Sequence, residues 1–454
     1  MKTFFIAALT FFYLASVPAG CTSTAVTIRD IHILPQNHTY YLAPQTISVP
    51  ESVQESQERS YMTRYFFPWH PDREPPEQDI FMRQFLRFTE NPGYGENKKK
   101  RSPAWIKELR QNAAMENYPN TDATAISLIT ANLRILPTDK PVYSTPEGYP
   151  FDRLQTSSIA PNTPLRVLHA SADNGWFLVQ APYAHGWIAG RDIAFVDHSF
   201  IQTWKSGKHA VIIQDKILLH DQHGNFLFQA PIGSVFPIVK ETDASFQVLA
   251  AIANNDKQGM TVPILLSRKD AAARPLPLTG ENVARIANEL TNEPYGWGGL
   301  YQNRDCSGML KDFFAPFGIW LPRHSADQAR EVGNFIDLSS LSRLEKEKKI
   351  SEEGIPYLTL LWMRGHIMLY MGVHDGHPLV FHNVWGTVAK KRWSKAQRVI
   401  VGHAAITTMY PQLTGNSFSP FHGDLIDKII GMTLVLPQNT EVPDCGCGPG
   451  DEDI

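Results

Sequence analysis

Cys306 stands alone in the middle of the chain, and its surroundings favour a reactive thiol. The segment Asp305–Gly308 follows a glycine-rich loop and opens an apolar helical stretch, so we expect the thiol at a helix start. The free N–H groups and the positive dipole end of a helix favour the thiolate, which is the nucleophilic form. Arg304 adds positive charge, whereas Asp305 opposes the thiolate. These residues leave two interpretations open, a nucleophile and an inert buried thiol.

A thiol nucleophile needs an imidazole that takes up and returns its proton. Among the 16 histidines, His366 begins a strand-like run and His382 ends the next one. With a turn at residues 374–377, a regular hairpin places His382 opposite residue 369 or 370, several ångströms from His366. A strongly twisted or bulged pair of strands would close that gap. Either histidine also fits a structural role. The pattern therefore supports a pair of Cys306 and one histidine better than a catalytic set with the second histidine as its third residue.

The elements around these residues have an α+β order. We expect a helix over about 280–291, then a glycine-rich loop and the helix that Cys306 opens. A further helix near 324–332 precedes two strands around 366–373 and 379–385. Helices followed by strands indicate an α+β domain rather than alternating βαβ units.

Upstream of this domain, residues 130–272 show short strands separated by turns. This pattern predicts two small antiparallel β-barrels, over 129–196 and 197–272. A stretch with two prolines, 271–277, is expected to be an interdomain linker that leads to the C-terminal domain at 276–454.

The sequence of residues 21–128 predicts an N-terminal part that consists of a polar tether followed by a partly helical segment. One helix is expected over 79–88 and another from near Ala104. The basic run Lys98–Arg101 fits a solvated loop, or attraction to an anionic polymer or lipid.

A signal peptide is expected over residues 1–20. This stretch combines a basic start, an apolar run at 3–17 and small residues before Cys21. The apolar run is too short for a membrane span. Ala19-Gly20-Cys21 resembles the cleavage box of lipoproteins, whose cysteine carries a lipid, although Pro18 departs from that box. Ordinary secretory cleavage is the alternative. We therefore expect an exported protein of the bacterial periplasm or cell envelope, with a lipid anchor if Cys21 is used.

Composition limits the remaining functions. The chain has 454 residues, 42 Lys and Arg against 45 Asp and Glu, and 43% hydrophobic residues, which indicates a globular protein of about two to four domains. The balanced charge gives no basic excess for binding nucleic acid. Cys445 and Cys447 offer too few ligands to close a zinc site, so we expect no metal or other cofactor. The sequence determines neither the role of these two cysteines nor the oligomeric state.

The same residues resemble a known family, the NlpC-type papain-like cysteine peptidases of bacterial cell walls. Several separated motifs occur in the family's order between about 280 and 410. These motifs are Tyr295–Gly299, Asp305–Gly308, Leu321–Arg323, Gln328, Arg364–His366 and Phe381–Asn383. Upstream, Phe66–Trp69, Leu133–Thr138 and Phe151–Gln155 resemble members with an N-terminal stabilising segment and two bacterial SH3-like barrels. Residues 22–60 and 436–454 lie outside the resemblance.

The resemblance implies an α+β fold in which a papain-like C-terminal catalytic domain follows two SH3-like barrels and a partly helical N-terminal segment. It also implies hydrolysis of amide bonds in peptidoglycan stem peptides, commonly between γ-D-glutamate and a diamino acid such as diaminopimelate. Cys306 would be the nucleophile, His366 the general base and then acid, and His382 the group that orients His366. Backbone N–H groups at the helix start would bind the oxyanion.

For substrate binding, the resemblance implies that Arg304, Asp305 and Ser307 shape one end of the cleft. A carboxylate there would bind the free amine of a trimmed stem peptide. Tyr295 would line the cleft, or simply fill the core, and the first barrel would restrict which stem peptides enter. Two other functions stay open, a non-catalytic wall-binding scaffold and an amidase or acyltransferase that uses the same dyad. The sequence does not determine which stem bond is cut.

Overall fold

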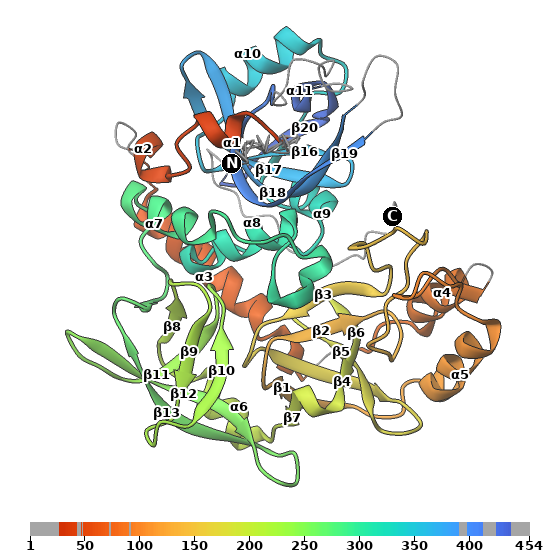
Figure 1. The fold of residues 1–454 in the computed structure, drawn as a ribbon. Coiled ribbons are helices and arrows are strands. Elements are labelled where there is room, and N and C mark those ends of the chain that lie inside the picture. The colour runs from red at the N-terminus through yellow and green to blue at the C-terminus, as the bar shows by residue number, and fades with distance from the viewer. Residues whose placement is uncertain are drawn as a thin grey trace, which may run out of the picture.

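Three β-rich units and a helical N-terminal segment make up the part of the chain that the structure describes (Figure 1). The computed structural model describes residues 27–42, 47, 49–71, 74–89, 92–389, 397–411 and 424–436. The predictions for the leader, Cys21, Cys445 and Cys447 lie outside these ranges. Among the described helices, none combines the length and the apolar character that crossing a bilayer requires.

A six-stranded antiparallel sheet forms the centre of the C-terminal domain, with the strand order β15-β20-β16-β17-β18-β19. Its strands are β15 (Asn334–Asp337), β16 (Thr359–Met363), β17 (His366–His374), β18 (His377–Ala389), β19 (Gln397–Thr408) and β20 (Gly431–Leu434). The helical elements are α7 (Gly280–Leu290), η4 (Trp297–Gln302), α8 (Cys306–Phe314), η5 (Ala315–Phe317), α9 (Ser325–Arg330), α10 (Arg343–Glu353) and α11 (Leu425–Lys428). This arrangement confirms the predicted α+β class.

Helix α8 packs against the sheet through its apolar side. Met309, Leu310 and Phe313 are fully buried, and they share one core with Ile367 and Leu369 of β17. Full burial of an apolar side chain of this size contributes roughly 1.5–3 kcal/mol. The packing therefore holds the N-terminal end of α8 against β17.

The first barrel is a seven-stranded sheet with the order β3-β2-β6-β5-β4-β1-β7. Its strands are β1 (Ala123–Ser127), β2 (Ala131–Arg134), β3 (Gln155–Ile159), β4 (Pro164–Ala170), β5 (Trp176–Gln180), β6 (His185–Ala189) and β7 (Ile193–Phe195), with a 3-10 turn η3 (Gly190–Asp192). Strand β1 pairs with both β4 and β7. The sheet therefore begins at Ala123, on the N-terminal side of residue 129.

The second barrel combines a five-stranded sheet, β13-β12-β11-β8-β14, with the hairpin β9-β10. Its elements are α6 (His198–Lys205), β8 (His209–Ile212), β9 (Ile217–His220), β10 (Phe226–Ala230), β11 (Val235–Glu241), β12 (Ser245–Ala253), β13 (Gly259–Ser267) and β14 (Ala271–Ala273). The prediction of a linker is wrong for Ala271–Ala273, because these residues pair with β8 in the sheet.

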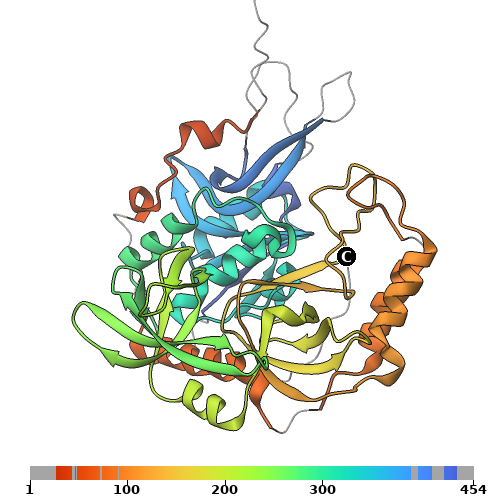
Figure 2. The ribbon, with the colours of Figure 1, turned by 60° about the horizontal axis from the view of Figure 1, so that its bottom comes forward.

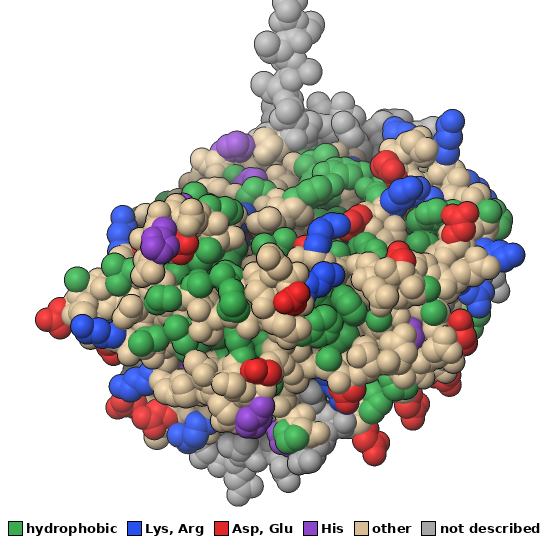
Figure 3. Space-filling view, turned by 90° about the horizontal axis from the view of Figure 1, so that it is seen from below, with side chains coloured by type: hydrophobic (Ala, Val, Ile, Leu, Met, Phe, Trp, Pro, Cys, Tyr) green, Lys and Arg blue, Asp and Glu red, His purple; other side chains and the backbone are tan. Residues whose placement is uncertain are grey.

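Seen from below, the surface of the molecule carries basic and acidic side chains mixed among apolar ones (Figure 3).

The N-terminal segment contacts all three β-rich units. Its elements are α1 (Asp30–Ile33), α2 (His38–Leu42), α3 (Glu51–Tyr65), η1 (Phe67–Trp69), α4 (Gln78–Thr89), α5 (Pro103–Ala113) and η2 (Met115–Asn117). The indole N–H of Trp69 donates to the Ala125 carbonyl of β1 at 3.0 Å. Helices α4 and α5 lie beside the first barrel (Figure 2).

Helix α3 occupies part of the stretch that was expected to be a polar tether. Its sequence has few apolar residues and no helical periodicity, so the pattern gave no helix signal. Tertiary contacts hold it instead: the Gln54 amide donates to the carbonyls of Leu276 and Phe317 at 2.6 and 3.1 Å. The chain therefore uses α3, through its buried residues Gln54, Tyr61 and Tyr65, as a connection between its units.

Arg274 provides a test of this connection. Its guanidinium binds both carboxylate oxygens of Glu58 on α3, at 3.0 and 2.9 Å, and is 1% exposed. Because Arg274→Ala leaves the mostly buried Glu58 carboxylate without its partner, we expect the free energy of unfolding to fall by about 3 kcal/mol. Urea denaturation measures this change. Arg191→Ala, which breaks an exposed ion pair with Asp139, is the control and should change it by under about 0.5 kcal/mol. Equal effects of the two variants would contradict the assignment.

Candidate active site

Cys306 is the first residue of α8 and is buried, with 7% of its surface exposed. Asp305 caps the helix, because its Oδ1 accepts the N–H of Gly308 at 2.8 Å. The backbone N–H groups of Ser307 and Ile367 face the thiol and act to lower its pKa. Ile367 follows His366 directly on β17, so the structure brings the predicted nucleophile next to the predicted base.

A β-bulge in β17 brings His366 and His382 together. At the turn the register is regular, with His374 opposite His377, but it shifts by one residue between Tyr370 and Gly372. Beyond the bulge Leu369 pairs with Phe381, which puts His382 opposite residue 368 rather than 369. Because side chains alternate between the faces of a sheet, the shift places the two histidines on the same face as diagonal neighbours. The predicted alternative of a bulged pair of strands is thus confirmed.

Three side chains form a hydrogen-bonded row on this face. His366 Nε2 lies 2.8 Å from His382 Nδ1, and His382 Nε2 lies 3.2 Å from the hydroxyl oxygen of Thr407 on β19. If Thr407 accepts the Nε2 proton of His382, then His382 Nδ1 accepts the Nε2 proton of His366. That assignment of protons leaves His366 Nδ1 with a free lone pair, which a general base requires. Sequence reasoning missed Thr407, because only the register of β18 and β19 brings it beside His382.

Burial sets the charges of this site. It raises the pKa of the Cys306 thiol to about 12, with the negative charge of Asp305 as the second cause, and the N–H groups of Ile367 and Ser307 oppose the rise. Burial also lowers the pKa of His366 to about 4 and that of His382 well below its ordinary value. At neutral pH the thiol and both imidazoles are therefore uncharged. Loss of hydration on burial thus affects the pKa of the Cys306 thiol more than the helix N-terminus does, contrary to the expected preference for thiolate.

Asp305 and Ser307 are joined to Arg323, which the sequence had marked only as part of a motif. Arg323 donates to both Asp305 oxygens at 3.0 and 2.7 Å and to the Ser307 hydroxyl at 3.0 Å. Its charge and hydrogen bonds lower the pKa of the Asp305 carboxyl against the effect of burial. Arg323 also donates to the hydroxyl of Ser157 on β3 at 2.9 Å. The cap of α8 is thus tied to the first barrel through Arg323.

Arg304, which the resemblance assigns to the substrate end of the cleft, is held by carboxylates of the catalytic domain and of the second barrel. Its guanidinium donates to both oxygens of Asp215 in the second barrel, each at 2.7 Å, and to Asp312 at 2.7 Å. Glu293 lies 3.4 Å away, and the arginine side chain is 5% exposed. Three carboxylates thus surround Arg304, and it connects the catalytic domain to the second barrel.

The glycine-rich loop before Cys306 packs directly on the first barrel. Gly298 and Gly299 have φ values of 58° and 86°, and a Cβ on Gly299 would lie 2.2 Å from the Ser158 hydroxyl oxygen. The Gln155 amide donates to the Gly298 carbonyl at 2.9 Å. Only glycine allows this backbone conformation and this close approach. The first barrel therefore forms a fixed wall beside the N-terminal end of α8.

Tyr295 lies beside the thiol and begins an aromatic row. It is half-buried, and burial together with the charges of Cys306 and Asp305 raises its pKa. Its ring centre lies 6.0 Å from that of Trp385, which lies 6.1 Å from that of Tyr149. Tyr149 belongs to a loop of the first barrel and is 53% exposed. The row leads from the thiol to the surface across two domains.

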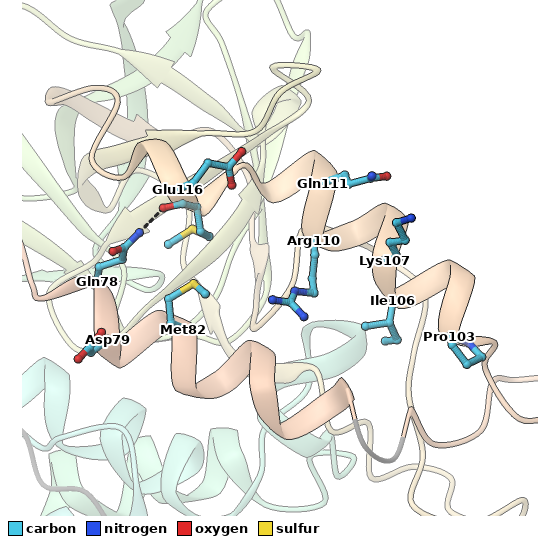
Figure 4. A pocket seen from close by; sticks show the side chains of 10 residues that line it. Gln78, Asp79, Met82, Pro103, Ile106, Lys107, Arg110, Gln111 and Glu116 are labelled. Carbon is cyan, nitrogen blue, oxygen red and sulfur yellow. Dashed lines mark hydrogen bonds between the residues drawn. The ribbon is translucent and has the colours of Figure 1, made fainter.

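A groove of about 800 Å³ lies elsewhere, between α4 and α5 (Figure 4). Met82, Ile106 and Met115 are among its lining residues, and the Gln78 amide donates to the Met115 carbonyl. None of the three predicted catalytic residues lines it. Within the described ranges, no cluster of three or more His, Cys, Asp or Glu residues could hold a metal ion.

Comparisons with known proteins agree with this architecture. Residues 4–118 match the NLPC_P60 stabilising domain, 141–189 an SH3 domain of the SH3b1 type, 197–243 an SH3 domain of the SH3b2 type and 292–397 the NlpC/P60 family. A search of curated proteins found no match.

Two solved structures resemble the chain. An NlpC/P60 endopeptidase from Photobacterium damselae subsp. piscicida has a TM-score of 0.79 at 23% identity, over 91% of this chain and 99% of that one. An NlpC/P60 family protein from Bacillus cereus has a TM-score of 0.48 at 15% identity, over 69% of this chain and 100% of that one.

The fold and the site define a papain-like domain with a Cys–His–His arrangement, supported by two SH3-like barrels and a stabilising segment. The chain therefore contains an NlpC/P60 family domain behind an NLPC_P60 stabilising domain and two SH3 domains. This domain supports a cell-wall peptidase, and thus a hydrolase.

Thr407→Val tests the row of hydrogen bonds. Valine keeps the shape of threonine but removes the oxygen that accepts from His382, so the proton on His382 is free to move to the nitrogen that faces His366. If the site is catalytic, we expect kcat for release of peptides from peptidoglycan to fall about tenfold, in the range found for partners of catalytic groups. Thr407→Ser, which keeps the hydroxyl, is the matched control and should retain most of the rate. Equal rates for both variants and the wild type would contradict this role.

The pH dependence of stability tests the burial of His366. Its folded pKa of about 4 lies below the value of about 6.5 in an unfolded chain, so between these pH values the unfolded state binds more protons. The resulting stability is complete above about pH 6.5 and is lost as the pH falls toward 4. We expect His366→Gln to reduce the slope of unfolding free energy against pH by up to about 1.4 kcal/mol per unit in this window. Urea denaturation at several pH values measures the slope. The exposed His198 serves as control through His198→Gln, and an unchanged slope in His366→Gln would refute the prediction.

Proposed function

We propose that the protein is a cysteine endopeptidase that hydrolyses amide bonds in peptidoglycan stem peptides. The observation that carries the proposal is the packing of Cys306, at the start of α8, in one core with Ile367 of β17, the residue next to His366, whose ring is hydrogen-bonded to His382. The NlpC/P60 domain surrounds this arrangement. A neutral thiol and a neutral imidazole with one free nitrogen are suited to general-base catalysis.

The reaction follows from these groups. His366 takes the thiol proton as Cys306 Sγ attacks the carbonyl carbon, and backbone N–H groups at the start of α8 stabilise the oxyanion. His366 then gives the proton to the leaving amine, and the C–N bond breaks to leave an acyl-enzyme. Water attacks the thioester with His366 as base, and release of the acid restores the thiol. Residues His382 and Thr407 orient His366 throughout.

The bond most consistent with the family resemblance joins γ-D-glutamate to a diamino acid such as diaminopimelate. Asp305, Ser307 and Tyr295 would lie at the end of the cleft that takes the peptide's amine, as the resemblance implies. The SH3-like barrels support binding to peptidoglycan.

The proposed place of action is outside the cytoplasm. A signal peptide over residues 1–20 would deliver the chain to the periplasm or cell envelope, and Cys21 would carry a lipid if the lipoprotein box is used. The substrate lies in the same compartment, which supports the combination of leader and enzyme.

Cys306→Ala tests the proposal. Because the variant lacks the nucleophile, we expect no release of peptides from purified peptidoglycan above background, while circular dichroism and thermal unfolding stay close to the wild type. Defined tri- and tetrapeptide muropeptides, with and without the sugar, then identify the bond through the masses of the products.

Three outcomes separate the alternatives. Release by Cys306→Ala equal to the wild type would refute the mechanism. Sedimentation of wild-type protein with peptidoglycan, without any cleavage, would indicate a wall-binding scaffold. Products in which an acyl group is transferred to an added amine, rather than hydrolysed, would indicate an acyltransferase.

A further inference from the structure

An N-terminal strap, residues 27–42, lies along the outer edge of the catalytic sheet. Strand β19 is the last strand in the sheet order, and the backbone of residues 292–295 pairs with its outer edge at 402–404, which leaves residues 406 and 408 to other partners. Helix α1 of the strap contacts β19, and Figure 1 shows this red helix against the blue strands. Unpaired backbone groups at a sheet edge need other partners when they are buried. The strap supplies them at one position in particular.

Two strap side chains bind the residues on either side of Thr407. The Gln36 amide donates to the Ile406 carbonyl at 3.1 Å and accepts the Ile406 N–H at 2.8 Å, as a neighbouring strand would. Asp30 Oδ2 accepts both the N–H and the hydroxyl of Thr408, at 2.8 and 2.7 Å. Three hydrogen bonds to the backbone, and a fourth to the Thr408 hydroxyl, thus hold β19 on both sides of Thr407.

Thr407 is the residue that these contacts hold in place. Its side chain is 1% exposed and meets His382, which is 3% exposed. A hydrogen bond at 3.2 Å tolerates little displacement before it is lost, since such bonds weaken steeply with distance and angle. The position of β19 at this point therefore decides whether Thr407 can accept the proton of His382.

We propose that the N-terminal strap is a positioning element of the active site, acting through Thr407 and His382 on His366. This inference rests on the proposed function, because it concerns the same site. Asp30 and Gln36 touch neither the thiol nor the two histidines, and they act by holding β19. A strap with a purely structural role would instead change stability and leave kcat unaltered.

The other end of the strap supplies a matched control. Asn288 of α7 accepts the His38 N–H at 2.8 Å and donates to the Thr39 hydroxyl at 3.2 Å. The variant Asn288→Ala loosens the same strap but removes no contact with β19. It therefore reports the effect of weaker strap binding alone.

The test measures kcat, KM and thermal unfolding for Asp30→Ala, Gln36→Ala and Asn288→Ala in the full chain, with purified peptidoglycan as substrate. We expect kcat to fall about tenfold in the first two variants with KM within twofold, and to stay within twofold of the wild type in Asn288→Ala. Asp30→Asn keeps an oxygen that accepts from Thr408, so it should restore most of the rate even if Asp30→Ala folds poorly.

A double-mutant comparison gives the decisive result. If the strap acts through Thr407, adding Asp30→Ala or Gln36→Ala to Thr407→Val lowers kcat no further, because the contact that the strap positions is already gone. Full additivity, or wild-type kcat with reduced stability in the single variants, would overturn the inference. Cys306→Ala assayed in parallel separates the two proposals. Activity in that variant refutes the enzyme mechanism, whereas an inactive Cys306→Ala beside fully active strap variants refutes only the role of the strap.

Discussion

The hydrogen bond between His366 and His382 depends on one extra residue in β17. Without the bulge at Met371, the hairpin would place the two rings on opposite faces of the sheet, where no side-chain rotation could join them. With it, both rings lie on one face, and Thr407 on the next strand completes the row. These hydrogen bonds leave the Nδ1 atom of His366 with a free lone pair. The geometry of β17, β18 and β19 thus controls which nitrogen of His366 carries the proton.

Buried arginines connect the units that surround this sheet. Arg304 joins the catalytic domain to Asp215 of the second barrel, and Arg323 joins the cap of α8 to the first barrel. Arg274, which follows β14, joins the start of the catalytic domain to Glu58 of α3. Each guanidinium forms two or more directed hydrogen bonds, which fixes orientation as well as distance. Such pairs contribute little net stability when compared with apolar packing, but removing one partner is costly. They therefore hold the barrels in one arrangement around the N-terminal end of α8.

The charge state of the site shows which electrostatic effect dominates. A helix N-terminus and two N–H donors favour a thiolate at Cys306, yet burial and the charge of Asp305 hold the thiol protonated. The same burial keeps His366 neutral. Charge then has to form during the reaction, next to N–H groups that are already in place, which is where preorganised dipoles stabilise a transition state most.

The sequence by itself determined the candidate residues and the order of the units. Cysteine before an apolar helix, histidines at the ends of two strand-like runs and short strands upstream were sufficient to predict an α+β domain behind two barrels, because residue type and periodicity are local properties. Helix α3, the partners of Arg304 and the role of Thr407 were decided by the tertiary structure. A polar helix gains its stability from distant contacts, a guanidinium takes whichever carboxylates the fold brings near, and a one-residue bulge changes which face every later side chain occupies. These effects depend on residues far apart in the chain, and no local pattern records them.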